Sequence, residues 1–183
     1  MPRLFVALEL PADLREQLAA FRRGLPGARW VEEEQFHLTL AFLGEVEGPV
    51  FASVKEGLHG VRSDPFELQL AGTGRFPARG QAKVLWAGVR DPTEVSALAK
   101  EIQRCLARRG LPLDSRRYAP HVTLARLKAT PAHDVDTYLE ASAGWVSEAH
   151  PFTDFHLYSS HLGRAGAQHR VEATYPLIPG SLD

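Results

Sequence analysis

The amino-acid sequence predicts an α+β protein built around an internal repeat. Hydrophobic residues make up 44% of its 183 residues, which is enough for a sizeable core. Strand-like and helix-like segments alternate without the regular rhythm of βαβ units. A seven-residue motif at 37–43 recurs at 121–127. Because no linker or low-complexity stretch separates the copies, we expect one domain over residues 1–183.

The first half of the chain predicts three strands, two helices and a long loop. Apolar residues three and four positions apart, as at Leu14, Leu18 and Phe21, indicate a helix. Short alternating or β-rich runs that end at Pro11 or Gly44 indicate strands. The predicted elements are a strand at 4–10, a helix after Pro11, a strand at 36–43, a helix at 49–61, a strand at 66–70 and a Gly- and Arg-rich loop at 72–80.

The second half predicts four more strands and two more helices. Asp91 followed by Pro92 is a good helix start, and Gly110 is a typical stop. Thr130 and Pro131 open the other helix in the same way. The predicted elements are strands at 83–89, 121–127, 152–160 and 171–177, helices at 92–109 and 131–143, and a turn at 163–166.

The composition excludes several classes of protein. A net charge of −1 excludes a polybasic surface that attracts nucleic acid everywhere. The single cysteine, Cys105, cannot form an intramolecular disulfide, and we expect it to be buried in a helix. No apolar run reaches the roughly 18–20 residues of a membrane span, and the N-terminus lacks a signal-peptide pattern, so we expect a cytoplasmic protein. Residues 101–130 are locally basic and predict a basic rim around the second motif.

The repeated motif brings histidine and threonine together. Residues 37–43 read His-Leu-Thr-Leu-Ala-Phe-Leu and residues 121–127 read His-Val-Thr-Leu-Ala-Arg-Leu. Because side chains alternate along a strand, His37 and Thr39 share one face, as do His121 and Thr123. If a two-fold axis relates the copies, two imidazoles and two hydroxyls surround a small polar volume.

This set of side chains suits phosphodiester hydrolysis without a metal. One imidazole can deprotonate water while the other protonates the leaving alkoxide, since a pKa near 6.5 allows both roles. The hydroxyls can donate hydrogen bonds to the phosphate oxygens. The residues alone leave open which histidine is the acid. The sequence contains no His-x-His, His-Glu-x-x-His or cysteine cluster, so we expect neither a metal nor a cofactor.

The motifs and their flanks resemble the 2H phosphoesterase superfamily, which is named for two His-x-[Thr/Ser]-x motifs. Within it, the chain is most similar to the bacterial and archaeal RNA 2',3'-cyclic phosphodiesterases, formerly called 2'-5' RNA ligases. Besides the motifs, the resemblance includes the segments 3–7, 74–77, 118–120 and 157–160. It implies a bilobal α+β fold, with antiparallel sheets of two pseudo-symmetric lobes lining a central cleft and helices outside. It also implies hydrolysis of a terminal RNA 2',3'-cyclic phosphate to a 2'-phosphomonoester, with 2'-5' ligation as a side reaction.

The resemblance assigns roles to the motif residues. It implies that His37 donates a proton to the departing 3'-oxygen and that His121 accepts one from water. Thr39 and Thr123 then hold the phosphate. Arg126 is a candidate phosphate contact, although strand alternation puts it on the face opposite to His121 unless a bulge intervenes.

Other residues are candidate RNA contacts. Arg116, Arg117 and Tyr118 precede the second motif, and arginine is a good phosphate ligand. Phe42 and Phe76 are candidate platforms for a base. For Phe42, packing in the core is the favoured interpretation.

Most of the remaining histidines are predicted to lie at the surface. His59, His133 and His150 are expected in solvated positions, and His156 is a weaker candidate for the cleft. His169 stands where relatives often carry an aromatic residue, which leaves base stacking there in doubt or gives it to His169.

The expected partners are RNA 3' ends or nucleotides that bear a 2',3'-cyclic phosphate. We expect no membrane and no obligate protein partner, with a monomer as the default. Two alternatives stay open. One is another 2H enzyme that acts on small cyclic nucleotides or 2'-5' linkages, and the other is a non-catalytic module that binds RNA ends.

Overall fold

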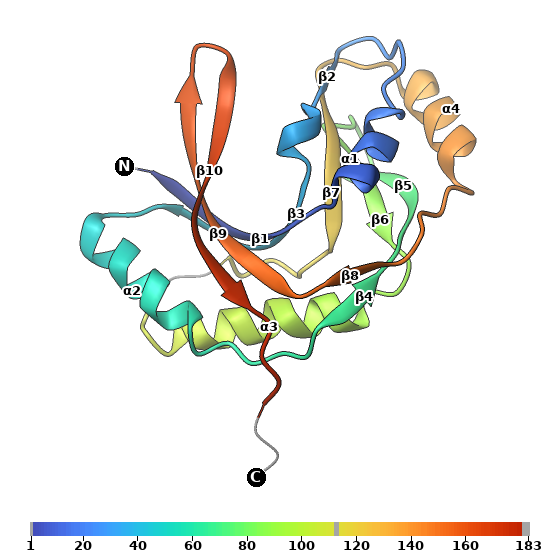
Figure 1. The fold of residues 1–183 in the computed structure, drawn as a ribbon. Helices are drawn as coiled ribbons and strands as arrows, with labels where there is room; N and C mark the ends of the chain where they lie inside the picture. Colours follow the sequence, from blue (N-terminus) through green and yellow to red (C-terminus); the bar gives the residue numbers. More distant parts are fainter. Residues whose placement is uncertain (1, 112–113, 181–183) are drawn as a thin grey trace.

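An antiparallel sheet forms the centre of the computed structural model, which describes residues 2–111 and 114–180 (Figure 1). In these residues the sheet has eight strands in the order β10-β9-β1-β3-β7-β6-β5, and β2 also pairs with β7. The strands are β1 (Arg3–Glu9), β2 (Ala28–Trp30), β3 (His37–Glu45), β5 (Leu70–Phe76), β6 (Val84–Val89), β7 (His121–Leu127), β9 (Asp154–Gly163) and β10 (Gly166–Pro176). A separate small sheet pairs β4 (Phe66–Leu68) with β8 (His150–Phe152).

The four predicted helices are confirmed, and each starts next to a proline. They are α1 (Ala12–Ala19), α2 (Gly48–Leu58), α3 (Thr93–Ala107) and α4 (Ala132–Ser142), with a short 3-10 turn at Glu33–Gln35. Helices α2 and α3 lie together on one side of the sheet, while α1 and α4 lie near β7 and β5 (Figure 1). The apolar stripe of α3 enters the core and includes Cys105, which is buried as expected. Within the described residues, no helix combines the length and apolar character that crossing a membrane requires.

The element order shows that the repeat is structural. When β2 and the 3-10 turn are left out, the series β1-α1-β3-α2-β4-β5 matches β6-α3-β7-α4-β8-β9. In the sheet, β9-β1-β3 corresponds to β5-β6-β7. Two strand pairs join residues that are 84 positions apart, as the motifs are: Leu38 with Val122, and Glu67 with Pro151. A pseudo-two-fold axis therefore passes through both pairs. Since β5 and β9 each pair with a strand of the other copy, neither copy holds a complete sheet of its own.

The predicted loop at 72–80 is wrong, because most of this segment belongs to β5. Its glycines make room for an indole ring: a Cβ on Gly74 would lie 2.1 Å from a ring atom of Trp86. Gly88, next to the same ring, has similarly little space. The short strands β2 and β8 were not predicted. The strand predicted at 171–177 is β10, which begins earlier, at Gly166. The prediction missed its first residues because they lack an apolar pattern.

Two of the remaining histidines are buried. His150 is 7% exposed and His156 is 6% exposed, so the surface prediction for His150 is wrong. The Nε2 atom of His150 lies 3.0 Å from a carboxylate oxygen of Asp13, and Nδ1 of His156 is 2.9 Å from the Thr174 hydroxyl. These contacts offset the free-energy cost of removing the imidazole nitrogens from water. His59 and His133 are exposed, as predicted.

Candidate active site

The pairing of β3 with β7 brings the two motifs together. These strands pair through Leu38 and Val122, the second residues of the two copies. In this antiparallel register, the histidine of each copy lies across from the threonine of the other. Leu38 and Val122 are fully buried on one sheet face, whereas the motif histidines and threonines are partly exposed on the other. We call this second face the motif face, and it is defined by His37, Thr39, His121 and Thr123.

Both imidazoles are oriented by the same hydrogen bond. Nδ1 of His37 lies 2.7 Å from the carbonyl oxygen of Gln35, and Nδ1 of His121 lies 2.7 Å from that of Ala119. A carbonyl oxygen only accepts, so Nδ1 carries the hydrogen in both rings. The Nε2 atom of each histidine is therefore the one that can accept or donate a proton in a reaction.

Aromatic rings pack beside both histidines. The ring centroid of Phe5 is 4.8 Å from that of His37, and Phe76 stands edge-on at 4.9 Å from His121. Tyr158 lies 6.3 Å from His37 and occupies on β9 the place that Phe76 occupies on β5. The candidate Phe76 is thus next to a motif histidine.

Burial against these rings disfavours the charged imidazolium. It lowers the pKa of His37 to about 4 and also lowers the pKa of His121. In the free protein at neutral pH both imidazoles are therefore mainly neutral. A bound phosphodiester anion would raise both pKa values, because a negative charge favours the protonated ring.

A bulge in each motif strand decides where Arg126 points. Leu124 of β7 has no partner in the register with β6, and Leu40 has none in the register with β1. The extra residue reverses the alternation, so that Arg126 becomes exposed on the side of His121. The same shift exposes Phe42, whose side chain is 49% accessible. The prediction that Phe42 packs in the core is therefore wrong.

The three candidates before the second motif are placed differently. The hydroxyl of Tyr118 donates a hydrogen bond of 2.9 Å to the carbonyl of Thr39, so it links the approach to β7 with β3. Arg116 pairs with Asp114 and lowers the pKa of that carboxyl to about 2. Arg117 is exposed. Tyr118 therefore has a structural role. Both arginines are exposed, and within the described residues only Arg116 of the two is paired with a carboxylate, which makes Arg117 the better candidate for an RNA phosphate.

Replacing Tyr118 by phenylalanine is expected to destabilise the protein by about 1 kcal/mol, because the Thr39 carbonyl loses its hydrogen bond. Urea denaturation of both proteins measures this change. Tyr138→Phe is the matched control, since its hydroxyl makes a longer bond of 3.3 Å, and a smaller loss is expected there. An unchanged midpoint for Tyr118→Phe would show that the link does not contribute to stability.

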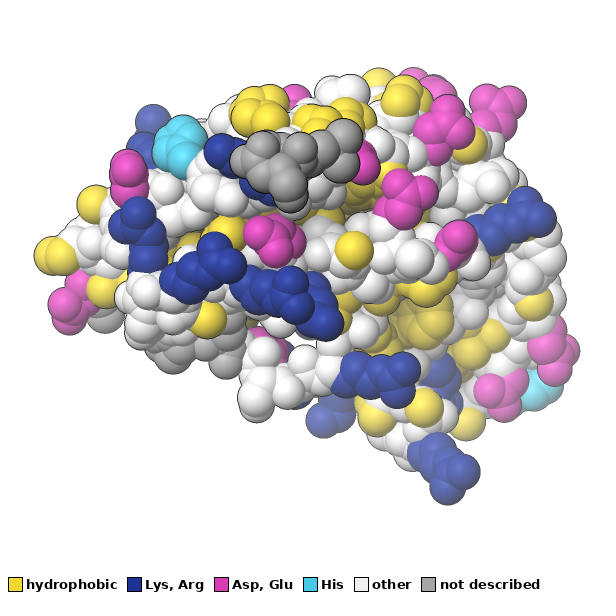
Figure 2. Space-filling view, turned by 90° about the horizontal axis from the view of Figure 1, so that it is seen from below, with side chains coloured by type: hydrophobic (Ala, Val, Ile, Leu, Met, Phe, Trp, Pro, Cys, Tyr) yellow, Lys and Arg dark blue, Asp and Glu magenta, His cyan; other side chains and the backbone are white. Residues whose placement is uncertain are grey.

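The basic rim predicted for residues 101–130 divides between two faces. Arg104, Arg108 and Arg109 are exposed on or just after α3, which packs on the sheet face opposite to the motif face. Figure 2, seen from the side of α2 and α3, shows several Lys and Arg side chains there. The exposed basic side chains on or next to the second motif are Arg116, Arg117, Arg126 and Lys128. The predicted basic rim around the motif is therefore limited to these residues, and the part on α3 lies elsewhere.

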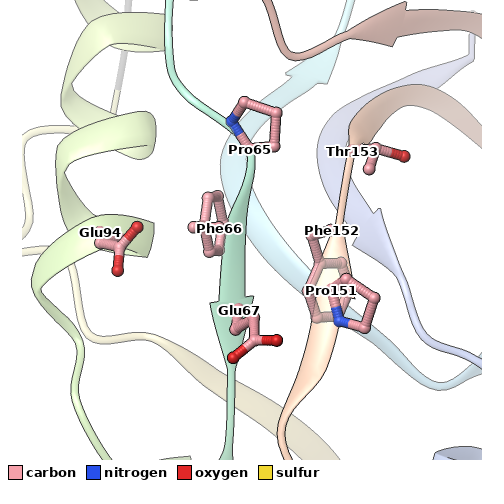
Figure 3. Close-up of a pocket in the computed structure, with 7 residues that line it drawn as sticks. All are labelled: Pro65, Phe66, Glu67, Glu94, Pro151, Phe152 and Thr153. Atoms are coloured by element: carbon pink, nitrogen blue, oxygen red, sulfur yellow. The ribbon is translucent and has the colours of Figure 1, made fainter.

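A hollow of about 420 Å³ lies elsewhere, against β4 and β8 (Figure 3). Its lining includes the carboxylates of Glu67 and Glu94 and no histidine. Acidic side chains repel phosphate anions. In the described ranges, no group of three His, Cys, Asp or Glu side chains is arranged to hold a metal ion. The motif face therefore remains the candidate active site.

Two residues near the motif face were not assigned a clear role from the sequence. The ring of His169 lies 5.2 Å from that of His37 and 5.0 Å from that of Phe5. Arg29 on β2 is the cross-strand partner of Arg126. Two arginines directly opposite each other repel, which favours an anion between them. No local pattern in the sequence indicates either contact, because both depend on strand register.

Comparison with known proteins supports this choice of site. The family model described as LigT like Phosphoesterase matches the chain twice, over residues 8–86 and 89–168. Each match contains one copy of the motif, in agreement with the internal repeat.

Several curated relatives carry the name RNA 2',3'-cyclic phosphodiesterase. The protein from Escherichia coli is 32% identical over 88% of this chain and 89% of its own. The one from Aeropyrum pernix is 39% identical over 64% of this chain, and the one from Geobacillus stearothermophilus is 35% identical over 67%. The match spans 65% of the Aeropyrum protein and 41% of the Geobacillus protein.

Solved structures agree with the fold. The apo form of E. coli LigT superposes with a TM-score of 0.78 at 29% identity, covering 97% of this chain and 98% of that one. E. coli LigT complexed with 3'-AMP has a TM-score of 0.75 at 28% identity, covering 97% and 99%. The α+β architecture predicted from the sequence is therefore confirmed.

Proposed function

The chain belongs to the LigT-like phosphoesterase family, and we propose that it hydrolyses the 2',3'-cyclic phosphate at RNA 3' ends to a 2'-phosphomonoester. The observation that carries this proposal is the pairing of β3 with β7, which sets two histidines and two threonines on one face. The names of the curated relatives support the same reaction.

The reaction uses the two free Nε2 atoms. Nε2 of His121 accepts a proton from water as the water oxygen attacks phosphorus. The bond from phosphorus to the 3'-oxygen breaks, and Nε2 of His37 gives its proton to that oxygen. The products are a 2'-phosphomonoester and a 3'-hydroxyl, and the two histidines have exchanged protonation states. The assignment of donor and acceptor follows the family resemblance.

The remaining side chains bind the substrate. The hydroxyls of Thr39 and Thr123 donate hydrogen bonds to the non-bridging phosphate oxygens as negative charge develops. Arg126 supplies positive charge beside them, and the exposed ring of Phe42 and the partly exposed ring of Phe76 offer surfaces for a base. Arg117 contacts the RNA backbone. No step requires a metal. With an RNA 5'-hydroxyl in place of water, the same groups form a 2'-5' linkage.

Product mapping tests this function directly. A defined RNA with a terminal 2',3'-cyclic phosphate should give only the 2'-phosphate, at an unchanged rate in excess EDTA. Chromatography against authentic 2'- and 3'-phosphate standards measures the outcome, and a cyclic mononucleotide serves as the comparison substrate.

Four results would count against the proposal. A 3'-phosphate product would mean that the other ester bond breaks. Loss of activity in EDTA, restored by a divalent cation, would exclude the metal-independent mechanism. Binding of the RNA without turnover would favour a non-catalytic module, and a higher rate on cyclic mononucleotides would favour a small-molecule enzyme.

A further inference from the structure

The pseudo-two-fold symmetry of the site is broken beside His37. The two motif histidines have equivalent strands and equivalent backbone acceptors, and Tyr158 beside His37 matches Phe76 beside His121. A third imidazole, that of His169, stands edge-on to the ring of His37 at 5.2 Å. Among the described residues, the rings that lie beside His121 are those of Phe76 and Trp86, and neither is an imidazole.

His169 reaches this position because its strand is fixed by the residue that orients His37. The backbone carbonyl of Gln35 accepts the Nδ1 hydrogen of His37. The side-chain amide of Gln35 donates a hydrogen bond to the carbonyl of Ala167 on β10. One residue therefore holds both His37 and the arm of the β9–β10 hairpin that presents His169 (Figure 1). The equivalent of Gln35 in the second copy, 84 positions later, is Ala119, which lacks a side-chain amide and cannot make this hydrogen bond.

We propose that His169 and Gln35 form a positioning pair that acts on His37 alone and makes the two motif histidines chemically unequal. The catalytic meaning of the pair rests on the proposed function. A protonated imidazole with a lowered pKa gives up its proton more readily, so the pair favours His37 as the donor, a distinction that two symmetric histidines would lack.

Two physical effects act on His37 through this pair. The His169 ring covers one side of His37 and removes water, which disfavours the charged imidazolium. When His169 itself carries a proton, its positive charge disfavours a second one on His37. Both effects lower the pKa of His37.

Other ionisable groups surround His37, but none of them duplicates His169. They are Glu9 on β1, His156 and Tyr158 on β9, His121 on β7, and Tyr118 before β7. Burial raises the pKa of Tyr118 and Tyr158, so both stay neutral over the relevant range. His156 lies 3.5 Å from a carboxylate oxygen of Glu9 and 3.4 Å from one of Asp154. Of this set, only His121 also disfavours a proton on His37, and it belongs to the reaction.

His169→Phe tests the proposal because phenylalanine keeps a buried ring and removes the ionisable group. Burial is the main cause of the low pKa of His37 and is kept in this variant, so the variant tests the charge of His169 alone. Without that charge we expect the pKa of His37, followed by NMR titration of its Cε1 proton, to rise. The pKa of His121 should not move. Because His37 has the lower pKa, the low-pH limb of kcat/KM should shift to higher pH while the other limb stays in place.

Gln35→Ala is the second variant, and it should raise the pKa of His37 in the same direction by releasing β10. His161→Phe is the matched control, since it removes an exposed imidazole from the same hairpin. An unchanged pKa for His37 in His169→Phe, or an equal shift for His121, would overturn the proposal. The NMR titration needs no substrate. If the pKa of His37 moves but the RNA is not hydrolysed, the proposed function fails and the positioning pair stands.

Discussion

Replacing either motif histidine by alanine is expected to lower kcat/KM for a cyclic-phosphate RNA by about 10²–10⁴-fold. Each imidazole presents a free Nε2 atom on the motif face, and each is held by a carbonyl at 2.7 Å. Alanine removes the proton donor or the proton acceptor without replacing it. Because the two groups act in one step, the double variant should be little worse than the single ones. Steady-state rates on the same RNA measure all three.

His133→Ala is the matched control, because His133 is exposed on α4 and lies outside the site. It should leave both kcat and KM unchanged. The folded state of the two site variants is checked by urea denaturation, since their side chains are only partly buried and a large loss of stability is not expected. Full activity in either His37→Ala or His121→Ala would falsify the two-histidine mechanism.

The chemistry of the site could be predicted because the motif that carries it occurs twice in the sequence. A single His-x-Thr on a strand has little meaning, but the copy 84 residues later, with the same flanking apolar residues, predicts paired strands. The alternation of His37 and Thr39 with buried leucines then gives the face on which the chemistry lies. Helices were equally predictable, since apolar periodicity and starting prolines are local signals.

The residues that differ between the two halves could not be predicted with the same success. Simple alternation placed Arg126 on the wrong face, because a bulge depends on how β7 pairs with β6. The contact of His169 with His37 depends on the β9–β10 hairpin, and no local pattern indicates it. His150 looked like a surface residue because its carboxylate partner, Asp13, lies 137 positions away. Each of these is a tertiary effect between distant segments.

Gly74→Ala is expected to destabilise the protein by about 1–3 kcal/mol, because the added methyl group overpacks the strands β5 and β6 beside the second motif. A Cβ at this position would lie 2.1 Å from the Trp86 ring, and Trp86 is the cross-strand partner of Gly74. The indole cannot stay where it is. Its centroid is 5.4 Å from that of Phe76 and 6.4 Å from that of His121, so its displacement should also disturb the packing of His121 and lower kcat. Urea denaturation and steady-state kinetics measure the two effects.

Gly144→Ala is the matched control, since a Cβ there meets no atom within 4 Å, and its stability should change by less than about 0.5 kcal/mol. The double variant Gly74→Ala with Trp86→Phe identifies the cause. If the indole is what the new methyl group strikes, the smaller ring should recover part of the lost stability, and the two changes will not add. A Gly74→Ala protein as stable as the parent, or strictly additive losses, would show that the backbone adapts. The position of the Trp86 ring would then not require a glycine at residue 74.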